Sequence, residues 1–263
     1  STKKLTNAMQ LVATAKMQKQ KSAMAFNNGY SENYYRFLLA VLSAPVPEGG
    51  ENNPYLMPND RYNPLHIVIT SNSGLCGSYN QDLLKYVEEN VPKDEAIFAI
   101  GTQGIKWLTE NDYMVIKQYE DLEDFHPKVI NGLIFNVLKL YRESEISSID
   151  VIYTQYINSL NYVPSTFNLL PVEKPEWVTE TDILLEPSRD EVINELVPKY
   201  VSAAIYAAFL QAKSSEHAAR RNAMESANKN ADELIEKLQL RINQARQGSI
   251  TQEMTEIISG SMK

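Results

Sequence analysis

Two segments that each contain a pair of glycines are the nearest approach in this sequence to a phosphate-binding pattern. The segment 74–77 (Gly-Leu-Cys-Gly) follows the apolar run 66–70 and precedes a helical pattern over about 80–90. A turn between a strand and a helix can place backbone N–H groups around a phosphate. However, neither this segment nor 101–104 (Gly-Thr-Gln-Gly) has the G-x-G-x-x-G spacing or the Lys-Ser/Thr pair of a P-loop. We interpret both as glycines that serve their turns, and predict that the chain itself binds no nucleotide.

The other residues that could do chemistry are scattered along the chain. His66, His126 and His217 share no spacing with one another or with Cys76 that would suggest a metal site. The acidic residues within 120–124 form a run, and such runs are usually solvated. No Ser/His/Asp or Cys/His arrangement stands out. We therefore predict a non-catalytic protein without a metal or cofactor of its own.

The region that holds these turns alternates between strand patterns and helical patterns. Strands are predicted at 66–70, 96–100, 113–119, 149–157 and 166–172. Helices are predicted at about 80–90, through Trp107, and at about 127–142. Such alternation is typical of a mostly parallel sheet with helices on both faces. The sequence therefore predicts a Rossmann-like α/β domain.

The two ends of the chain carry long helical patterns. One runs from about Thr2 to Ser43, and the other, free of proline, from about Lys199 to Ser259. At ~1.5 Å per residue they would reach roughly 60 and 90 Å, and helices of this length require a partner along their course. Because the nearest partner of each is the other, we predict a long antiparallel intramolecular coiled coil. The alternative is a C-terminal helix buried in a globular core, which would favour more leucine and isoleucine than this alanine-rich stretch contains.

An apolar stripe at spacings of three and four supports a paired C-terminal helix. Its members are Val201, Ala204, Ile205, Ala208, Ala212, Ala227, Ala231, Leu234, Leu238, Ile242 and Ala245. Beyond Arg246 we expect this helix to outrun the N-terminal one. Met254, Ile257 and Ile258 would then be left for a binding partner to cover.

Charge is distributed unevenly along the chain. Residues 1–44 carry six basic and one acidic side chain, and residues 199–263 carry nine and seven, so the ends hold a net +7. Since the whole chain is −8, the remaining residues hold −15. The basic ends lack interleaved aromatics, which disfavours nucleic acid and favours an acidic protein partner. Most of the charged residues of the C-terminal helix are interpreted as a solvated face with weak i,i+4 pairs. They are Lys213, Glu216, Arg220, Arg221, Glu225, Lys229, Asp232, Glu233, Glu236, Lys237, Arg241 and Arg246.

Composition bounds the class of protein further. No apolar run approaches the roughly 18 residues of a membrane span, so we predict no direct membrane insertion. The single cysteine, Cys76, favours a reducing compartment. The chain opens at Ser1 in helical pattern, and we expect residues to precede it, so an absent targeting segment carries little meaning. The predicted divisions are a coiled-coil helix at 1–44, a linker at 45–64, the α/β domain at 65–188 and a coiled-coil helix at 189–263.

Three segments in the same order make a specific match to a known family. They are 5–17 (LTNAMQLVATAKM), 70–80 (TSNSGLCGSYN), and the stretch from 215–224 (SEHAARRNAM) to 244–253 (QARQGSITQE). Together they resemble the gamma subunit of F-type ATP synthases, and the resemblance covers essentially the whole chain. The acidic total and the long linker at 45–64 depart from the family's usual pattern.

The resemblance implies a central rotor shaft that couples rotation of a membrane ring to ATP synthesis or hydrolysis. The implied partners are three alpha and three beta subunits, the epsilon subunit and the membrane ring of c subunits. ATP, ADP and Mg would be bound by the alpha and beta partners. The implied location is peripheral, on the cytoplasmic face of a bacterial plasma membrane, with the mitochondrial matrix as the less favoured alternative.

The family's motifs also imply contact residues between rotor and stator. Met9 and Lys16 are expected where acidic loops of the beta subunits meet the rod. Arg246 and Gln247 are expected to bond to a catch on a beta subunit, with Thr251 and Glu253 just beyond. Met9 could instead be a simple seam residue, and Arg246 a solvated arginine.

Three alternatives remain open from the sequence. The chain could be a gamma-like paralogue serving another rotary ATPase, a stand-alone coiled-coil scaffold, or a nucleotide-using enzyme built on the α/β domain. Proton and sodium coupling are not distinguished.

Overall fold

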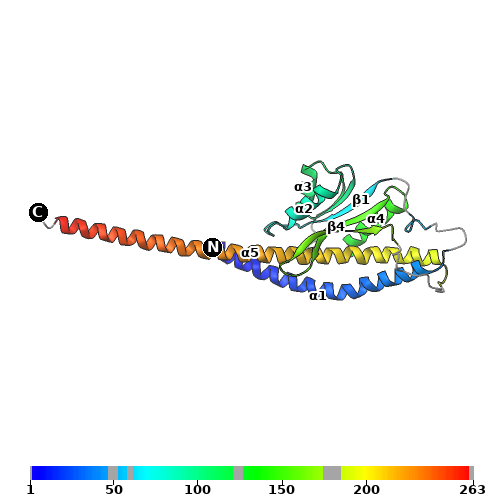
Figure 1. The fold of residues 1–263 in the computed structure, drawn as a ribbon, viewed down its shortest axis with the longest axis horizontal. Helices are drawn as coiled ribbons and strands as arrows, with labels where there is room; N and C mark the ends of the chain where they lie inside the picture. The colour runs from blue at the N-terminus through cyan, green and yellow to red at the C-terminus, as the bar shows by residue number, and fades with distance from the viewer. Residues whose placement is uncertain (1, 47–52, 58–61, 121–126, 174–184, 261–263) are drawn as a thin grey trace.

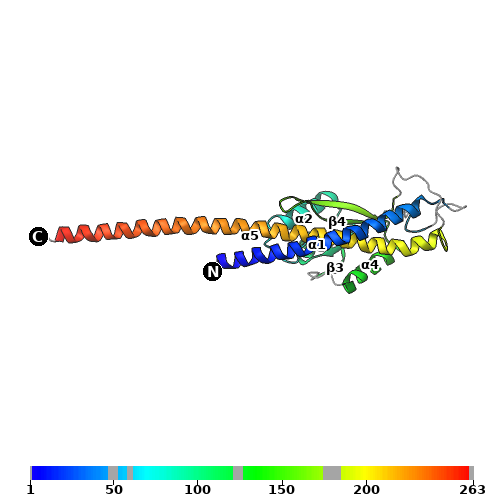
Figure 2. The same ribbon diagram turned by 90° about the horizontal axis from the view of Figure 1, so that it is seen from below.

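Two helices from opposite ends of the chain, α1 (Thr2–Ser43) and α5 (Arg189–Gly260), lie side by side and antiparallel along the molecule (Figure 1 and Figure 2). An α/β domain sits on one side of this pair. The computed structural model describes residues 2–46, 53–57, 62–120, 127–173 and 185–260. Three features of the sequence analysis lie wholly or partly outside the described residues. They are His126, the acidic run 120–124 except Glu120, and much of the 45–64 linker.

The domain is built on a five-stranded sheet in the order β3-β2-β1-β4-β5. The first four strands in that order are parallel, and β5 pairs antiparallel with β4 at the edge. This confirms the predicted α/β fold class. The strands are β1 (Pro64–Ile69), β2 (Ala96–Ile100), β3 (Val115–Tyr119), β4 (Ser148–Tyr156) and β5 (Tyr162–Leu170). The remaining helices are α2 (Tyr79–Asn90), α3 (Thr102–Glu110) and α4 (Pro127–Arg142).

Helices cover both faces of the sheet because successive strand residues alternate between two cores. Ile67 and Phe98 belong to the larger core, which α4, α5 and the end of α1 complete. Their neighbours Val68 and Ile97 face the other way, into a smaller core with α2 and α3. The larger core of the domain therefore includes residues of α5, so this section of the helix packs into the domain.

The start of α5 includes a proline. The proline-free pattern was predicted from about Lys199 and the division of the chain was placed at 189; the helix begins at Arg189 and continues through Pro198. A proline inside a helix removes one backbone hydrogen bond and costs roughly 3 kcal/mol. Ile193 and Val197 are fully buried in the larger core. We infer that this burial offsets the cost of Pro198, so helix and proline coexist.

The two long helices contact each other from the start of α1 to near its end. Near the start of α1, Lys3 pairs with Asp232, and Thr6 Oγ1 donates to Asn228 Oδ1 at 2.5 Å. Near its end, the rings of Tyr35 and Tyr200 lie 6.2 Å apart. Beyond the Lys3 contact α5 runs alone (Figure 1).

The upper part of the predicted apolar stripe lies on the section of α5 beyond the Lys3 contact. Leu234, Leu238 and Ile242 are 58%, 48% and 64% exposed. The lower part of the stripe is buried, and Val201, Ile205, Ala208 and Ala212 belong to the larger core of the domain. The coiled-coil prediction and the alternative of a helix buried in a globular core therefore each describe one section of α5. The pattern of spacing identifies a stripe without specifying what covers it.

The glycines of 101–104 pack against one threonine. Gly101 has a φ of 95°, and a Cβ there would lie 2.5 Å from the carbonyl oxygen of Thr70. At Gly104, a Cβ would lie 2.5 Å from the Thr70 side chain, whose Oγ1 accepts the Gly104 N–H at 2.9 Å. These glycines serve the close approach of α3 to β1, in line with the interpretation that they serve their turn.

Candidate functional site

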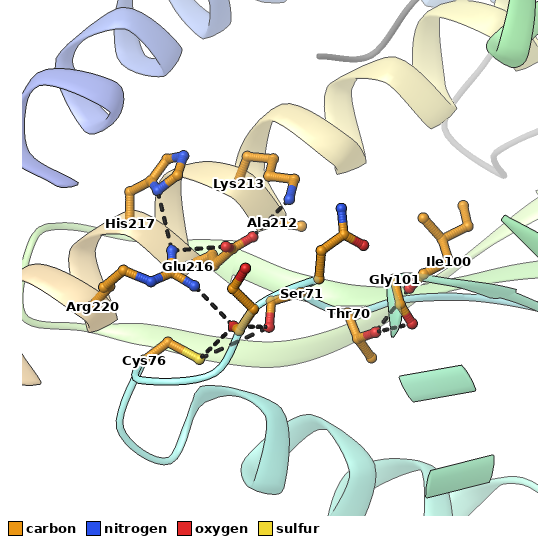
Figure 3. Close-up of polar contacts among 12 residues, drawn as sticks. Thr70, Ser71, Cys76, Ile100, Gly101, Ala212, Lys213, Glu216, His217 and Arg220 are labelled. Atoms are coloured by element: carbon orange, nitrogen blue, oxygen red, sulfur yellow. Dashed lines mark hydrogen bonds and ion pairs between the residues drawn. The ribbon is translucent and has the colours of Figure 1, made fainter. Parts of the chain in front are cut away.

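The turn 71–78 lies where open α/β sheets usually bind ligands. It follows the carboxyl end of β1, next to β4, and strand order reverses at this point. Here that position is filled by α5 itself (Figure 3). Ser215 Oγ donates to the carbonyl of Thr154 in β4 at 3.1 Å, and Arg220 reaches the turn on the other side. The place of a ligand is thus taken by a helix of the same chain.

A buried group of charges, the α5 charge cluster of Lys213, Glu216 and Arg220, holds this arrangement. Lys213 Nζ donates to Glu216 Oε2 at 2.8 Å, and Arg220 Nη1 donates to Glu216 Oε1 at 2.8 Å. The three side chains are 6%, 5% and 11% exposed. The interpretation of most charged residues on this helix as a solvated face fails for these three, because it considered the helix without the domain that packs on it, whereas Lys229, Lys237 and Arg241 are exposed.

Arg220 also connects the cluster to the turn. Its Nη2 donates to the carbonyl of Ser73 at 2.9 Å and to that of Gly74 at 3.3 Å. Leu75 and Gly77 both have a φ of 60°, which turns the chain back on itself. The turn thus presents carbonyl oxygens to a cation of α5. A phosphate site has the opposite polarity, because it presents backbone N–H groups to an anion.

Burial and neighbouring charges set the protonation of the cluster. Burial opposes ionisation of Glu216, but the Lys213 and Arg220 cations outweigh it and lower the pKa of that carboxyl. For His217, burial is the largest cause of a pKa lowered to about 4, and the cations of Arg220, Lys213 and Lys16 lower it further against the attraction of Glu216. At neutral pH His217 is therefore neutral beside a charged network.

The apolar side of the turn packs against the same helix. Cys76 and Tyr79 form a small core with Ala219, and the Tyr79 hydroxyl donates to the carbonyl of Ala212 at 3.1 Å. Burial raises the pKa of the Cys76 thiol. This cysteine is therefore a packing residue that attaches the turn to α5.

The structure brings two of the predicted contact residues together with this junction. Met9 is half-buried and Lys16 exposed on α1, and both line a pocket of about 280 Å³. Ser73, His217 and Arg220 line its other side. The pocket thus joins α1, α5 and the turn at one level of the helix pair.

The other four predicted contact residues lie elsewhere. Arg246, Gln247, Thr251 and Glu253 are all exposed on the part of α5 that runs alone. Thr251 Oγ1 donates to the carbonyl of Gln247 at 2.8 Å, within the helix. At ~1.5 Å per residue, Arg246 lies about 40 Å along α5 from the pocket. The predicted contacts therefore form two separate groups.

Within the described residues, no group of three or more His, Cys, Asp or Glu side chains could hold a metal ion. None of the helices in these same ranges has a stretch that is both long and apolar enough to cross a bilayer.

Comparison with known proteins assigns the family. The family model described as ATP synthase matches residues 1–262. The chain is 36% identical to the ATP synthase gamma chain of Lachnoclostridium phytofermentans, over 99% of this chain and 94% of that protein. It is 34% identical to the ATP synthase gamma chain of Clostridium beijerinckii, over 99% and 93%. This chain belongs to the ATP synthase gamma chain family.

Solved structures share the fold of this gamma chain family member. The central stalk of the Tetrahymena thermophila mitochondrial ATP synthase matches with a TM-score of 0.63 and 20% identity, over 85% of this chain and 99% of that one. The rotor of the Euglena gracilis mitochondrial enzyme matches with a TM-score of 0.58 and 16% identity, over 95% and 99%.

The α5 charge cluster was not predicted from the sequence. The i,i+3 and i,i+4 spacing of Lys213, Glu216 and Arg220, at the 215–224 motif, was nevertheless a signal for it.

Proposed function

We propose that this chain is the central rotor shaft of an F-type ATP synthase, coupling rotation of a membrane ring to chemistry in its partners. The observation that carries the proposal is the helix α5, which extends far beyond the α/β domain (Figure 2). Together with membership of the gamma chain family, this projection supports an axle that enters a ring of other subunits. The scaffold and nucleotide-enzyme alternatives lose their support, whereas a specialised rotary ATPase remains within the proposal.

The mechanism follows from symmetry. A single helix with a domain on one side has no threefold axis, so it contacts three equivalent neighbours unequally. Unequal contact biases each neighbour toward a different conformation, whereas equal contact would shift nothing. Rotation exchanges these biases and so couples to nucleotide binding and release. Because coupling free energies are reciprocal, hydrolysis can drive the shaft in the opposite direction.

The proposed partners are three alpha and three beta subunits around the shaft, with epsilon and the ring of c subunits at its lower end. ATP, ADP and Mg would bind to the alpha and beta subunits, and this chain would supply no catalytic group. The net basic charge of the ends supports acidic surfaces around the shaft. The proposed location is the cytoplasmic face of a bacterial plasma membrane.

The two groups of contact residues are proposed to act at two levels. Met9 and Lys16 lie beside the pocket at the junction with the domain, where acidic loops of the beta subunits would meet the shaft. Arg246 and Gln247 would bond to a beta-subunit catch farther along, followed by Thr251 and Glu253. All four lie on the section of α5 that extends beyond the domain, which supports this assignment.

Assembly tests the proposal directly. The chain is expressed with alpha and beta chains, and the purified complex should contain each of these in threefold excess over it. A probe on the α/β domain should rotate when ATP is added. A chain attached to the outside of its oligomer, or one that does not rotate, would refute the proposal.

The second group of contacts gives a mutational prediction. Replacing Arg246 and Gln247 by alanine is expected to lower the complex's rate of ATP hydrolysis by at least about tenfold, because charged interface hydrogen bonds contribute roughly 1.5–3 kcal/mol and each ~1.4 kcal/mol corresponds to a factor of ten in rate. The matched control replaces Gln239 and Arg241, which are exposed on the same helix. Circular dichroism should show that both variants keep their helices. An ATP hydrolysis rate equal to that of the control would contradict the assignment.

A further inference from the structure

The seam between α1 and α5 contains a level at which polar side chains of both helices bond to one another. Thr6 Oγ1 donates to Asn228 Oδ1 at 2.5 Å, and Asn228 Nδ2 donates to Gln10 Oε1 at 2.8 Å. Asn228 is 9% exposed, and Thr6 and Gln10 are half-buried. We call these three residues the seam lock. Both ends of one buried amide are satisfied by two residues that lie about one turn apart on α1.

The levels on either side of the seam lock have a different chemistry. On one side, Ala13, Met17 and Met224 are buried and apolar. On the other side, Lys3 pairs with Asp232, but these side chains are 41% and 52% exposed. Apolar burial is non-directional, and exposed ion pairs contribute little. The seam lock therefore supplies directional contacts to a section of the pair whose neighbouring contacts do not specify one alignment.

A buried amide in a helix seam costs stability but specifies how the helices are aligned. Asn228 carries one acceptor and one donor group, and it satisfies both only when Thr6 and Gln10 face it together. If α1 turned about its own axis by one residue, the buried amide would lose these partners, and an unsatisfied buried polar group is costly. The seam lock therefore opposes rotation of α1 about its axis.

The rotation of α1 decides where Met9 and Lys16 point. Seven residues make about two turns, so these two side chains lie on one side of α1. Both line the pocket that His217 and Arg220 also line. Gln10 follows Met9 directly in the chain, so the same turn of helix carries the seam lock and the predicted contact residue. A shift by one residue would turn the Met9 side of α1 by about 100°.

We propose that Asn228 is a positioning residue, which orients α1 through Thr6 and Gln10 so that Met9 and Lys16 face their contact with the beta subunits. This inference rests on the proposed function and adds a residue that is not among the predicted contacts. Asn228 acts here through α1 and not through contact with a partner. Its effect on activity should therefore follow the orientation of α1 and not the stability of the chain.

Replacing both amides by leucine separates orientation from stability. The variant with Gln10→Leu and Asn228→Leu removes the donor and the acceptor together, and such replacements are nearly neutral or stabilising. Thr6 keeps its bond to the carbonyl of Lys3 at 3.1 Å. Urea unfolding of the full chain should therefore give a midpoint no lower than that of the wild type.

Pulsed EPR on the full chain measures the orientation of α1. Nitroxide-bearing amino acids are placed at Asn7 on α1 and Glu236 on α5, both exposed. The wild type should give one narrow distance distribution, and the leucine pair one at least twice as wide. A narrow distribution in the leucine pair would overturn the inference.

Two further variants serve as controls for the same measurement. Exchanging the amides, with Gln10→Asn and Asn228→Gln, keeps a donor and an acceptor on each side of the seam and should keep the distribution narrow. Gln18→Leu with Asn230→Leu changes exposed amides on the same two helices and should have no effect. A wide distribution in the exchanged pair would contradict the role of the amides.

ATP hydrolysis by the assembled complex tests the consequence for function. The leucine pair should slow hydrolysis at least threefold, whereas the exchanged pair and the exposed control should stay within twofold of the wild type. If complexes with the leucine pair assemble, rotate and hydrolyse ATP at the wild-type rate, the positioning role fails and the proposed function stands. Failure of the wild-type chain to assemble or rotate would instead refute the proposed function, and with it this role for Asn228.

Discussion

Replacing Glu216 by glutamine is expected to lower the free energy of unfolding of this chain by about 3–5 kcal/mol, because it leaves buried cations without their anion. Glu216 accepts from both Lys213 and Arg220 at 2.8 Å, and its side chain is 5% exposed. A glutamine oxygen can accept one of these bonds, but its NH₂ group would face the other cation. Urea unfolding followed by circular dichroism measures the change.

The control for this prediction is a similar pair on the same helix. Arg221 and Glu225 are also four residues apart, at 3.6 Å, but their side chains are 32% and 44% exposed. An exposed pair of this kind contributes about 0–1 kcal/mol. Glu225→Gln should therefore change stability by less than about 1 kcal/mol. If the two variants lose the same stability, the α5 charge cluster does not hold the domain to α5.

The regular elements of this fold could be predicted from sequence because each has its own local signal. The first helix and α4 have the predicted bounds, Thr2–Ser43 and Pro127–Arg142. The strands β1 and β2 are short runs buried along their whole length, so they read as continuous apolar segments. The local signals at the start of α5 conflict. The predicted division at 189 lies at the start of the helix, but the proline-free pattern begins only at about Lys199, because Pro198 is a local signal to stop that the burial of Ile193 and Val197 opposes.

The junction between α5 and the domain could not be predicted for a different reason. Glu216 and Arg220 have the spacing of an ordinary surface pair, and only tertiary packing decides whether such a pair is exposed or buried. The motif around them identified the family but did not reveal that Arg220 contacts the carbonyls of the turn 71–78. Conversely, the motif placed Met9 and Lys16 on the rod, and the structure adds the pocket that they share with α5.

This junction explains how an α/β domain can hold a long helix at the position where related sheets bind a ligand. The position where such sheets usually bind ligands is occupied by α5 through contacts to β4 and to the turn. A domain whose core includes part of α5 cannot rotate independently of that helix. Torque applied at the domain would therefore pass to α5 through buried contacts, and the exposed ion pairs farther along α5 would contribute little to this connection.

Acid is expected to loosen the same junction through His217. The pKa of this histidine is lowered from 6.5 to about 4 in the folded chain, first by burial and then by the Arg220, Lys213 and Lys16 cations. The unfolded chain therefore binds more protons between these two values, and stability falls as the pH falls through that range. Each pH unit corresponds to ~1.4 kcal/mol, so the full loss from this group is about 3 kcal/mol.

Replacing His217 by glutamine should remove this part of the pH dependence, since glutamine does not titrate. Unfolding free energies at pH 7, 5.5 and 4.5 should diverge between the two chains, with the wild type losing more stability. Glu216 contributes in a lower range, because its pKa is lowered from 4.5 and its stabilisation is lost only as the pH falls below that value. The difference between the two curves above pH 4.5 therefore isolates His217. Parallel curves would show that the imidazole is solvated, and that the pocket beside Met9 admits water to the junction.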